Sequence, residues 1–155
     1  MEHFDVIIIG AGPAGSCAGA MLAQAGKRVL CLEKQHFPRF SIGESLLPHC
    51  MEFLTAAGMA ATLQHHAESL GFQFKNGAAF LKNDIRTAFD FTDKFSPGPG
   101  TTFQVKRAAF DKLLADAAAE QGLQIRYGVT VQQCDHLQAQ QAVLTVSDET
   151  NSQYQ

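Results

Sequence analysis

The chain has 155 residues, of which 46% are hydrophobic, and this length and composition exclude a disordered protein and predict one domain with a core. Twelve basic and 15 acidic residues give a net charge of −3 without a basic cluster, so neither nucleic acid nor a membrane surface is an expected partner. The first apolar run ends at Gly10 with no basic segment before it, and no stretch has membrane-spanning length, so we expect a cytoplasmic protein.

The first third of the chain predicts a β-α-β unit. Residues 4–9 form an apolar run typical of a buried strand, residues 14–25 form an alanine-rich helix that Gly26 ends, and residues 28–32 form a second buried strand. Parallel strands joined by a helix make a right-handed crossover. We therefore expect an α/β fold built on a parallel sheet.

The later elements are expected to be shorter and to include a β-meander. Residues 34–46 lack a clean periodicity and predict a loop. Phenylalanines alternate with polar residues between Phe72 and Phe91, which predicts half-buried strands. Residues 107–121 carry an apolar stripe typical of a helix that Gly122 ends. The other expected elements are a helix at 48–57, a short helix to about residue 66, a turn at 96–100, strands at 103–105, at 125–131 with a bend at Gly128 and at 142–146, and a polar tail at 148–155.

The turn between the first strand and the first helix reads G-A-G-P-A-G and predicts a dinucleotide site. Gly10 permits a tight turn, Gly12 leaves the backbone open to a pyrophosphate, and Gly15 lets the helix pack close to the strand. Pro13 suits the first helical position, where free N–H groups favour phosphate. Glu33 would accept hydrogen bonds from an adenosine ribose and repel a 2′-phosphate, which disfavours NADP. The alternative is a glycine-rich turn beside a chance acid.

The cysteines and histidines do not have the spacing of a metal site. The four cysteines form no C-x-x-C pair. Cys17 and Cys31 fall in the first helix and the second strand, where small buried thiols are expected. His65 and His66 are the only adjacent histidines, and neighbouring residues on a helix point in different directions. We therefore expect no metal.

Three stretches of the chain together resemble one protein family. They are residues 5–15 with Glu33 and Lys34, residues 37–48, which read F-P-R-F-S-I-G-E-S-L-L-P, and residues 105–115, which read V-K-R-A-A-F-D-K-L-L-A. The chain resembles the FAD-dependent oxidoreductases that group flavin-dependent halogenases with geranylgeranyl-reductase-like enzymes and aromatic-hydroxylase-type monooxygenases. The second stretch is most similar to the halogenase-like branch. The resemblance implies a Rossmann-like FAD-binding domain of the glutathione-reductase type over residues 1–155, incomplete at its C-terminus, with the substrate domain largely absent.

The resemblance implies FAD as the cofactor and assigns residues to it. The segment 43–45 would lie near the flavin, and the backbone at Val131 would touch adenine. Arg107 matches an arginine that reaches the cofactor, the alternative being a solvated charge at a helix start. The expected cofactor-binding residues are Gly10, Gly12, Pro13, Ala14, Gly15, Glu33, Lys34, Arg39, Gly43, Glu44, Ser45, Arg107 and Val131. Binding of NAD in place of FAD is the alternative for the glycine turn.

Lys75 is the expected catalytic residue. It lies 31 residues after Glu44, where the resemblance implies the lysine that holds or orients hypohalous acid in halogenase-like members. An ammonium group can hydrogen-bond an oxidised halogen and direct it toward an electron-rich ring, while the flavin activates oxygen. The alternative is an ordinary surface lysine on a strand.

The resemblance implies an FAD-dependent oxidoreductase, most similar to a monooxygenase or halogenase, that acts on a small organic substrate and has a separate flavin reductase as a candidate partner. A geranylgeranyl-type reductase and a non-catalytic nucleotide-binding module are the alternatives. The chain contains no tryptophan, although related sequences often carry tryptophans just before the arginine that Arg107 matches, and any later tryptophan motif would lie beyond residue 155. We expect the chain alone to bind FAD weakly or not at all, and to be inactive.

Overall fold

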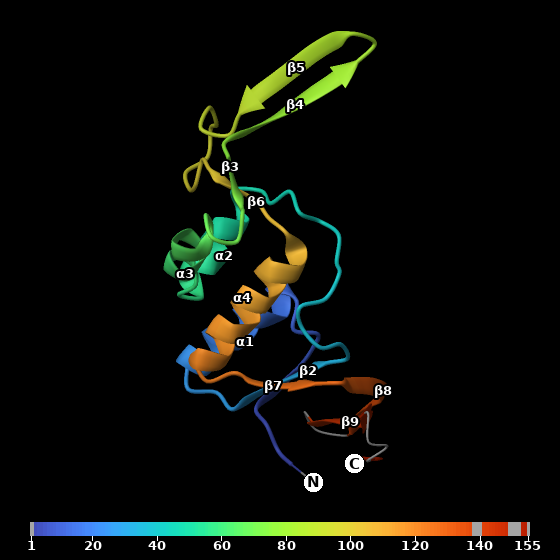
Figure 1. Ribbon diagram of the computed structural model, residues 1–155. Coiled ribbons are helices and arrows are strands. Elements are labelled where there is room, and N and C mark those ends of the chain that lie inside the picture. The colour runs from blue at the N-terminus through green and yellow to red at the C-terminus, as the bar shows by residue number, and fades with distance from the viewer. Residues whose placement is uncertain (1, 138–140, 149–152, 155) are drawn as a thin grey trace. The chain divides into compact units, whose positions relative to one another are not determined.

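The computed structural model describes residues 2–137, 141–148 and 153–154. The chain divides into two compact units, and Figure 1 shows the elements of each. The first unit takes residues 1–39 and 111–155, and the second takes residues 40–110.

A parallel sheet forms the base of the first unit. Strand β1 (Val6–Ile9) leads through helix α1 (Pro13–Gln24) to β2 (Val29–Glu33). The strand order is β1-β2-β7, where β7 (Gln124–Tyr127) comes from much later in the chain, and both pairings are parallel. The expected β-α-β start is therefore confirmed. All five residues of β2 are buried, as a central parallel strand requires.

An antiparallel meander follows the parallel sheet along the chain. Strands β8 (Val129–Leu137), β9 (Gln141–Asp148) and β10 (Gln153–Tyr154) have the order β10-β9-β8. Gly128, at φ +71°, separates β7 from β8 and confirms the expected bend. Strand β10 lies within the segment that was expected to be only a polar tail.

Helix α4 (Arg107–Glu120) belongs to the first unit from Asp111 onward. The expected stripe was Phe110, Leu113, Leu114 and Ala117. The buried face differs from it, because Leu113 is only half-buried whereas Ala115 and Ala118 join the face. The buried residues of this face are Asp111, Leu114, Ala115, Ala117 and Ala118. Gly122, at φ +104°, ends the helix as expected.

The second unit combines two short helices with a small antiparallel sheet. Helices α2 (Cys50–Ala56) and α3 (Ala60–His66) confirm the two expected helices. Strand β3 (Gln73–Lys75) pairs with β6 (Thr102–Gln104). The core of this unit contains Met51, Leu54, Met59, Leu63, Phe72 and Phe110.

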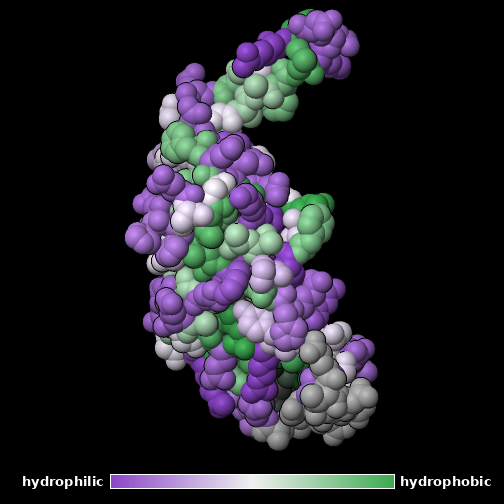
Figure 2. Space-filling model, viewed as in Figure 1, coloured by the Kyte–Doolittle hydropathy of each residue, from purple (hydrophilic) through white to green (hydrophobic). Residues whose placement is uncertain are grey.

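A β-hairpin extends from this sheet. Strands β4 (Gly77–Lys82) and β5 (Ile85–Asp90) pair through a two-residue turn, Asn83-Asp84, whose φ angles are +48° and +62°. The expected strands are present, but the expectation that they are half-buried was wrong for this hairpin. Its large apolar side chains are exposed, and Figure 2 shows green surface there; they are Phe80, Leu81, Ile85 and Phe89. Phe80 and Leu81 are adjacent, so β4 lacks the alternation of a half-buried strand, and all four side chains are more than half exposed within the described part of the chain.

Candidate functional site

The glycine turn joins β1 to α1 and is built from the backbone. Gly10 has φ +97°, and its N–H donates to the Leu32 carbonyl at 2.8 Å, which anchors the turn to β2. Gly12 is the N-cap of α1 and has no side chain to cover the free N–H groups of the first helical turn. Pro13 occupies the first helical position, as expected.

Gly15 and Gly12 differ in the space available for a side chain. A Cβ on Gly15 would lie 2.0 Å from the Gly10 carbonyl oxygen, so Gly15 is required for close packing of α1 on the turn. Apart from adjoining backbone, a Cβ on Gly12 would lie within 4 Å of one atom of the described residues, the Arg39 Nη2 at 3.6 Å. The backbone at Gly12 is therefore open, which fits a pyrophosphate group on the helix N-terminus.

Glu33 ends β2 and is tied to the glycine turn. Its Oε2 accepts a hydrogen bond from the Ala11 N–H at 2.9 Å, and its Oε1 accepts one from the Gln35 N–H at 3.0 Å. A carboxylate offers about four acceptor positions, so capacity remains for hydroxyl donors. The structure thus places Glu33 against the turn, whereas Lys34 is exposed and Val131 is half-buried on β8.

Arg39 and Asp111 add a charge pair beside Glu33. Arg39 Nη1 lies 3.2 Å from the Asp111 Oδ2, and Arg39 Nε lies 3.9 Å from the Glu33 Oε1. Asp111 is fully buried. Arg39 Nε is also buried and has no hydrogen-bond partner among the described residues. Sequence reasoning missed Asp111, and the available signal was an acid on the buried face of a helix, one turn before Ala115.

Burial changes the acidity of one thiol near this site. Burial, with a smaller contribution from the Glu33 carboxylate, raises the pKa of Cys31 from 9.0 to about 12. Cys31 is fully buried in β2, as expected of a small buried thiol, whereas the same expectation was wrong for Cys17 in α1, which is only half-buried.

In the second unit, the I-G-E-S-L segment runs beside β6. The Glu44 carbonyl accepts a hydrogen bond from the Val105 N–H at 2.8 Å, and the Leu46 N–H donates to the Phe103 carbonyl at 3.2 Å. Ser45 forms an antiparallel bridge with Gln104. This pairing places residues 44–46 along one edge of β6, opposite the edge that β3 occupies.

Gly43 and Arg107 lie together in this unit. Gly43 has φ +97°, and a Cβ there would lie 2.9 Å from the Arg107 Nη1. The same nitrogen donates a hydrogen bond to the Ile42 carbonyl. Arg107 is therefore held against the I-G-E-S-L segment, unlike a fully solvated charge at a helix start.

Lys75 is held by three neighbours. Its Nζ donates to the Ser45 Oγ at 2.7 Å and to the Leu46 carbonyl at 2.8 Å, and it lies 5.1 Å from the centre of the Phe91 ring. The side chain reaches across β6 from β3, and the residue is half-buried. The expected catalytic lysine and one expected cofactor-binding residue, Ser45, are thus in direct contact.

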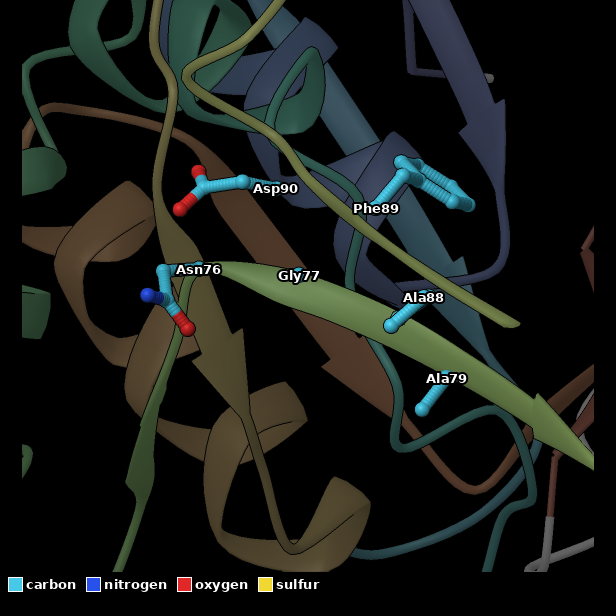
Figure 3. A pocket seen from close by; sticks show the side chains of 7 residues that line it. Asn76, Gly77, Ala79, Ala88, Phe89 and Asp90 are labelled. Carbon is cyan, nitrogen blue, oxygen red and sulfur yellow. The ribbon is translucent and has the colours of Figure 1, made fainter. Parts of the chain in front are cut away.

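A hollow of about 400 Å³ lies on the hairpin and is lined by residues 76–79 and 88–90. Figure 3 shows the residues that line it, and none of the expected site residues is among them. Among the described residues, His, Cys, Asp and Glu side chains nowhere gather in a group of three that could bind a metal ion. None of the helices in the described part of the chain combines the length and hydrophobicity of a membrane span.

Comparison with known proteins identifies the kind of domain. The FAD binding domain family matches residues 3–155. The chain is 40% identical to the flavin-dependent halogenase armH1 of Armillaria mellea over 83% of this chain and 24% of that protein. It is 37% identical to the 1H-pyrrole-2-carbonyl-[peptidyl-carrier protein] brominase of Pseudoalteromonas luteoviolacea over 83% and 29%. The chain therefore spans about a quarter of the length of these relatives.

Solved structures agree with this result. A flavoprotein/dehydrogenase from Cytophaga hutchinsonii aligns with a TM-score of 0.91 and 43% identity over 99% of this chain and 36% of that one. The myxobacterial chondrochloren halogenase CndH, an FAD-dependent halogenase, aligns with a TM-score of 0.80 and 33% identity over 99% and 35%.

Proposed function

Because the chain belongs to the FAD binding domain family, whose cofactor is FAD, we propose that it is the cofactor-binding part of a flavin-dependent, halogenase-like oxidoreductase. The halogenases among its relatives support this class of activity. A small organic molecule is the proposed substrate, and a separate flavin reductase is the proposed source of electrons.

The glycine turn with its attached carboxylate is the observation that carries the proposal. The open backbone at Gly12 and the N-terminus of α1 would hold the pyrophosphate of FAD. Glu33, fixed by the Ala11 N–H, would accept hydrogen bonds from the adenosine ribose. Lys34, Arg39 and the backbone of Val131 are assigned to the same half of the cofactor by the family resemblance.

The second unit supplies the remaining proposed contacts. Gly43, Glu44 and Ser45 form a segment fixed along β6, and Arg107 is held against it through the Ile42 carbonyl. We assign these four residues to FAD binding. The left-handed backbone at Gly43 strains any other residue there, and a Cβ at that position would force the Arg107 guanidinium to shift.

Lys75 is the proposed catalytic residue. Bound FAD would supply the redox chemistry with O₂. The Ser45 hydroxyl and the Leu46 carbonyl each accept a hydrogen bond from one of the three N–H groups of the Lys75 ammonium, so one donor remains to hydrogen-bond an oxidised halogen. These two hydrogen bonds restrict the direction of the Lys75 ammonium group. The ammonium group of a solvated lysine would have no such restriction.

Cofactor binding is tested by spectroscopy and melting. Because the chain alone is expected to bind FAD weakly, FAD is added in large excess; we expect it to raise the melting temperature of the protein and to show a bound flavin spectrum, with no protection by NAD. Protection by NAD alone would assign the turn to the nicotinamide dinucleotide, and no response to either ligand would favour a non-catalytic module.

Halogenation is tested on the full-length protein, which is supplied with a flavin reductase, O₂ and bromide or chloride. We expect halogenated product that Lys75→Ala abolishes and that Lys82→Ala, a change at an exposed lysine of the hairpin, leaves unchanged. Product insensitive to Lys75→Ala would remove the lysine from the mechanism. Saturation of a double bond without halogenation would support the reductase instead.

A further inference from the structure

We propose that Asp111 is a positioning residue that holds Arg39 so that its Nε, together with Glu33, binds one ribose hydroxyl of the adenosine nucleotide. This inference rests on the proposed function, because it concerns the same cofactor. It adds Asp111 to the site and gives a separate role to each charged side chain: Asp111 positions Arg39, and Arg39 and Glu33 bind the hydroxyl.

The guanidinium of Arg39 is fixed at one edge and open at another. Its Nη1 lies 3.2 Å from the Asp111 Oδ2, and its Nη2 lies 3.6 Å from the point that a Cβ on Gly12 would occupy. The group also stacks on the Phe37 ring at 4.8 Å. Nε and Nη2 share one edge of the planar group, and this edge is turned toward the open glycine turn and Glu33.

The buried Arg39 Nε indicates where the ribose hydroxyl would bind. It is buried without a hydrogen-bond partner among the described residues, and an arginine donor buried in this way requires an acceptor. The Glu33 Oε1 is 3.9 Å away, too far for a direct hydrogen bond. A hydroxyl placed between them would accept from Nε and donate to Oε1. A ribose hydroxyl has this dual capacity, whereas a phosphate oxygen could not donate to the carboxylate.

Asp111 is suited to this task by its position. It is fully buried on α4, and a buried carboxylate requires a partner of opposite charge. Its contact with Nη1 leaves the Nε–Nη2 edge unused and fixes the plane of the guanidinium. Asp111 itself is not proposed to touch the ligand.

The test is an NMR titration of the protein with ADP, 2′-deoxy-ADP and 3′-deoxy-ADP, which measures weak as well as strong binding. We expect the wild-type protein to prefer ADP over at least one deoxy analogue by about ten-fold or more. Asp111→Asn and Arg39→Lys should reduce this ratio to near one while the amide spectrum stays folded. Asp116→Asn, at an exposed position of the same helix, should keep the wild-type ratio.

Each outcome decides the matter. If Asp111→Asn weakens all three ligands equally, or keeps the preference for ADP, the positioning role is wrong although the nucleotide site stands. Should Asp111→Asn unfold the protein, Asp111→Glu takes its place, because the longer side chain keeps the negative charge but displaces the contact with Arg39 Nη1; a wild-type preference in that variant contradicts the positioning role. If the wild-type protein binds none of the nucleotides, the proposed function fails and this inference fails with it.

Discussion

At the scale of single residues, two glycines at the start of α1 have different roles: Gly15 is needed for the packing of the helix, and Gly12 is proposed to give the cofactor access to the backbone. Gly15→Ala would place a Cβ 2.0 Å from the Gly10 carbonyl oxygen, and backbone cannot yield as a side chain does. We expect the free energy of unfolding to fall by about 1–3 kcal/mol or more, measured by urea denaturation. An unchanged midpoint would contradict the close packing of α1 on the turn.

Gly12→Ala is the matched substitution. Its Cβ meets only the Arg39 Nη2 at an ordinary distance of 3.6 Å, and Gly12 has φ −66°, which any residue adopts. We expect stability to change by less than about 0.5 kcal/mol, whereas FAD affinity falls strongly because the methyl group occupies the proposed pyrophosphate position. FAD titration and urea denaturation of the same sample measure both effects. Equal FAD affinity would place the phosphates elsewhere.

The sequence located the glycine turn and Glu33 because their pattern is local. Strand, glycines and helix follow one another within a dozen residues, and backbone geometry requires glycine at Gly10 and Gly15. Asp111 could not be found in this way. Its partner Arg39 lies 72 residues earlier, and nothing local indicates that this acid is buried against a guanidinium. The roles of the expected site residues remain predictions.

At the scale of elements, the hairpin β4–β5 depends on its turn. Asn83 and Asp84 both have positive φ, as a type I′ turn requires, and glycine suits the second position better than aspartate. We expect Asp84→Gly to strengthen the hairpin by a few tenths to about 1 kcal/mol and Asp84→Ala to weaken it. Amide exchange across the Lys82–Ile85 pair measures this. Equal protection in both variants would contradict the turn assignment.

The alternating phenylalanines identified these strands but not their exposure. Alternation shows that one face of a strand is apolar, and it does not show what covers that face. Within the described residues, Phe80 and Phe89 stack on each other at 6.2 Å and remain exposed. The two-residue turn was also missed, although Asn-Asp between two strand-like runs is a recognisable hairpin signal.

At the scale of the whole molecule, the buried thiol of Cys31 links stability to pH. Its pKa is raised to about 12 in the folded protein, so the exposed thiol of the unfolded chain ionises first as the pH rises above 9.0. The free energy of unfolding should therefore fall between these values, by at most about 1.4 kcal/mol per pH unit. Cys31→Ala should flatten this dependence, measured by urea denaturation at several pH values.

Cys134→Ala is the control for that experiment, because Cys134 is exposed. Its variant should keep the wild-type dependence on pH. If Cys31→Ala and Cys134→Ala behave alike, the loss of stability above pH 9.0 comes from other groups, and the burial of Cys31 is not its cause.

The pairing of distant strands limited what could be predicted for the whole molecule. The alternation around residue 125 predicted a strand, and the structure adds that β7 is the third strand of the parallel sheet, in register with β2 from Leu30 opposite Gln124. More than 90 residues separate the two strands, and the periodicity of a strand does not indicate which distant strand it pairs with.

The hydrogen bond from the Ala11 N–H to Glu33 couples the choice of dinucleotide to the integrity of the fold. A change toward ligands with a phosphorylated ribose would begin by replacing this acid with a smaller or neutral residue. That replacement would also strip a fully buried amide of its acceptor. Engineering such a switch therefore demands at least two coordinated substitutions, one for the new ligand and one to rebuild the turn.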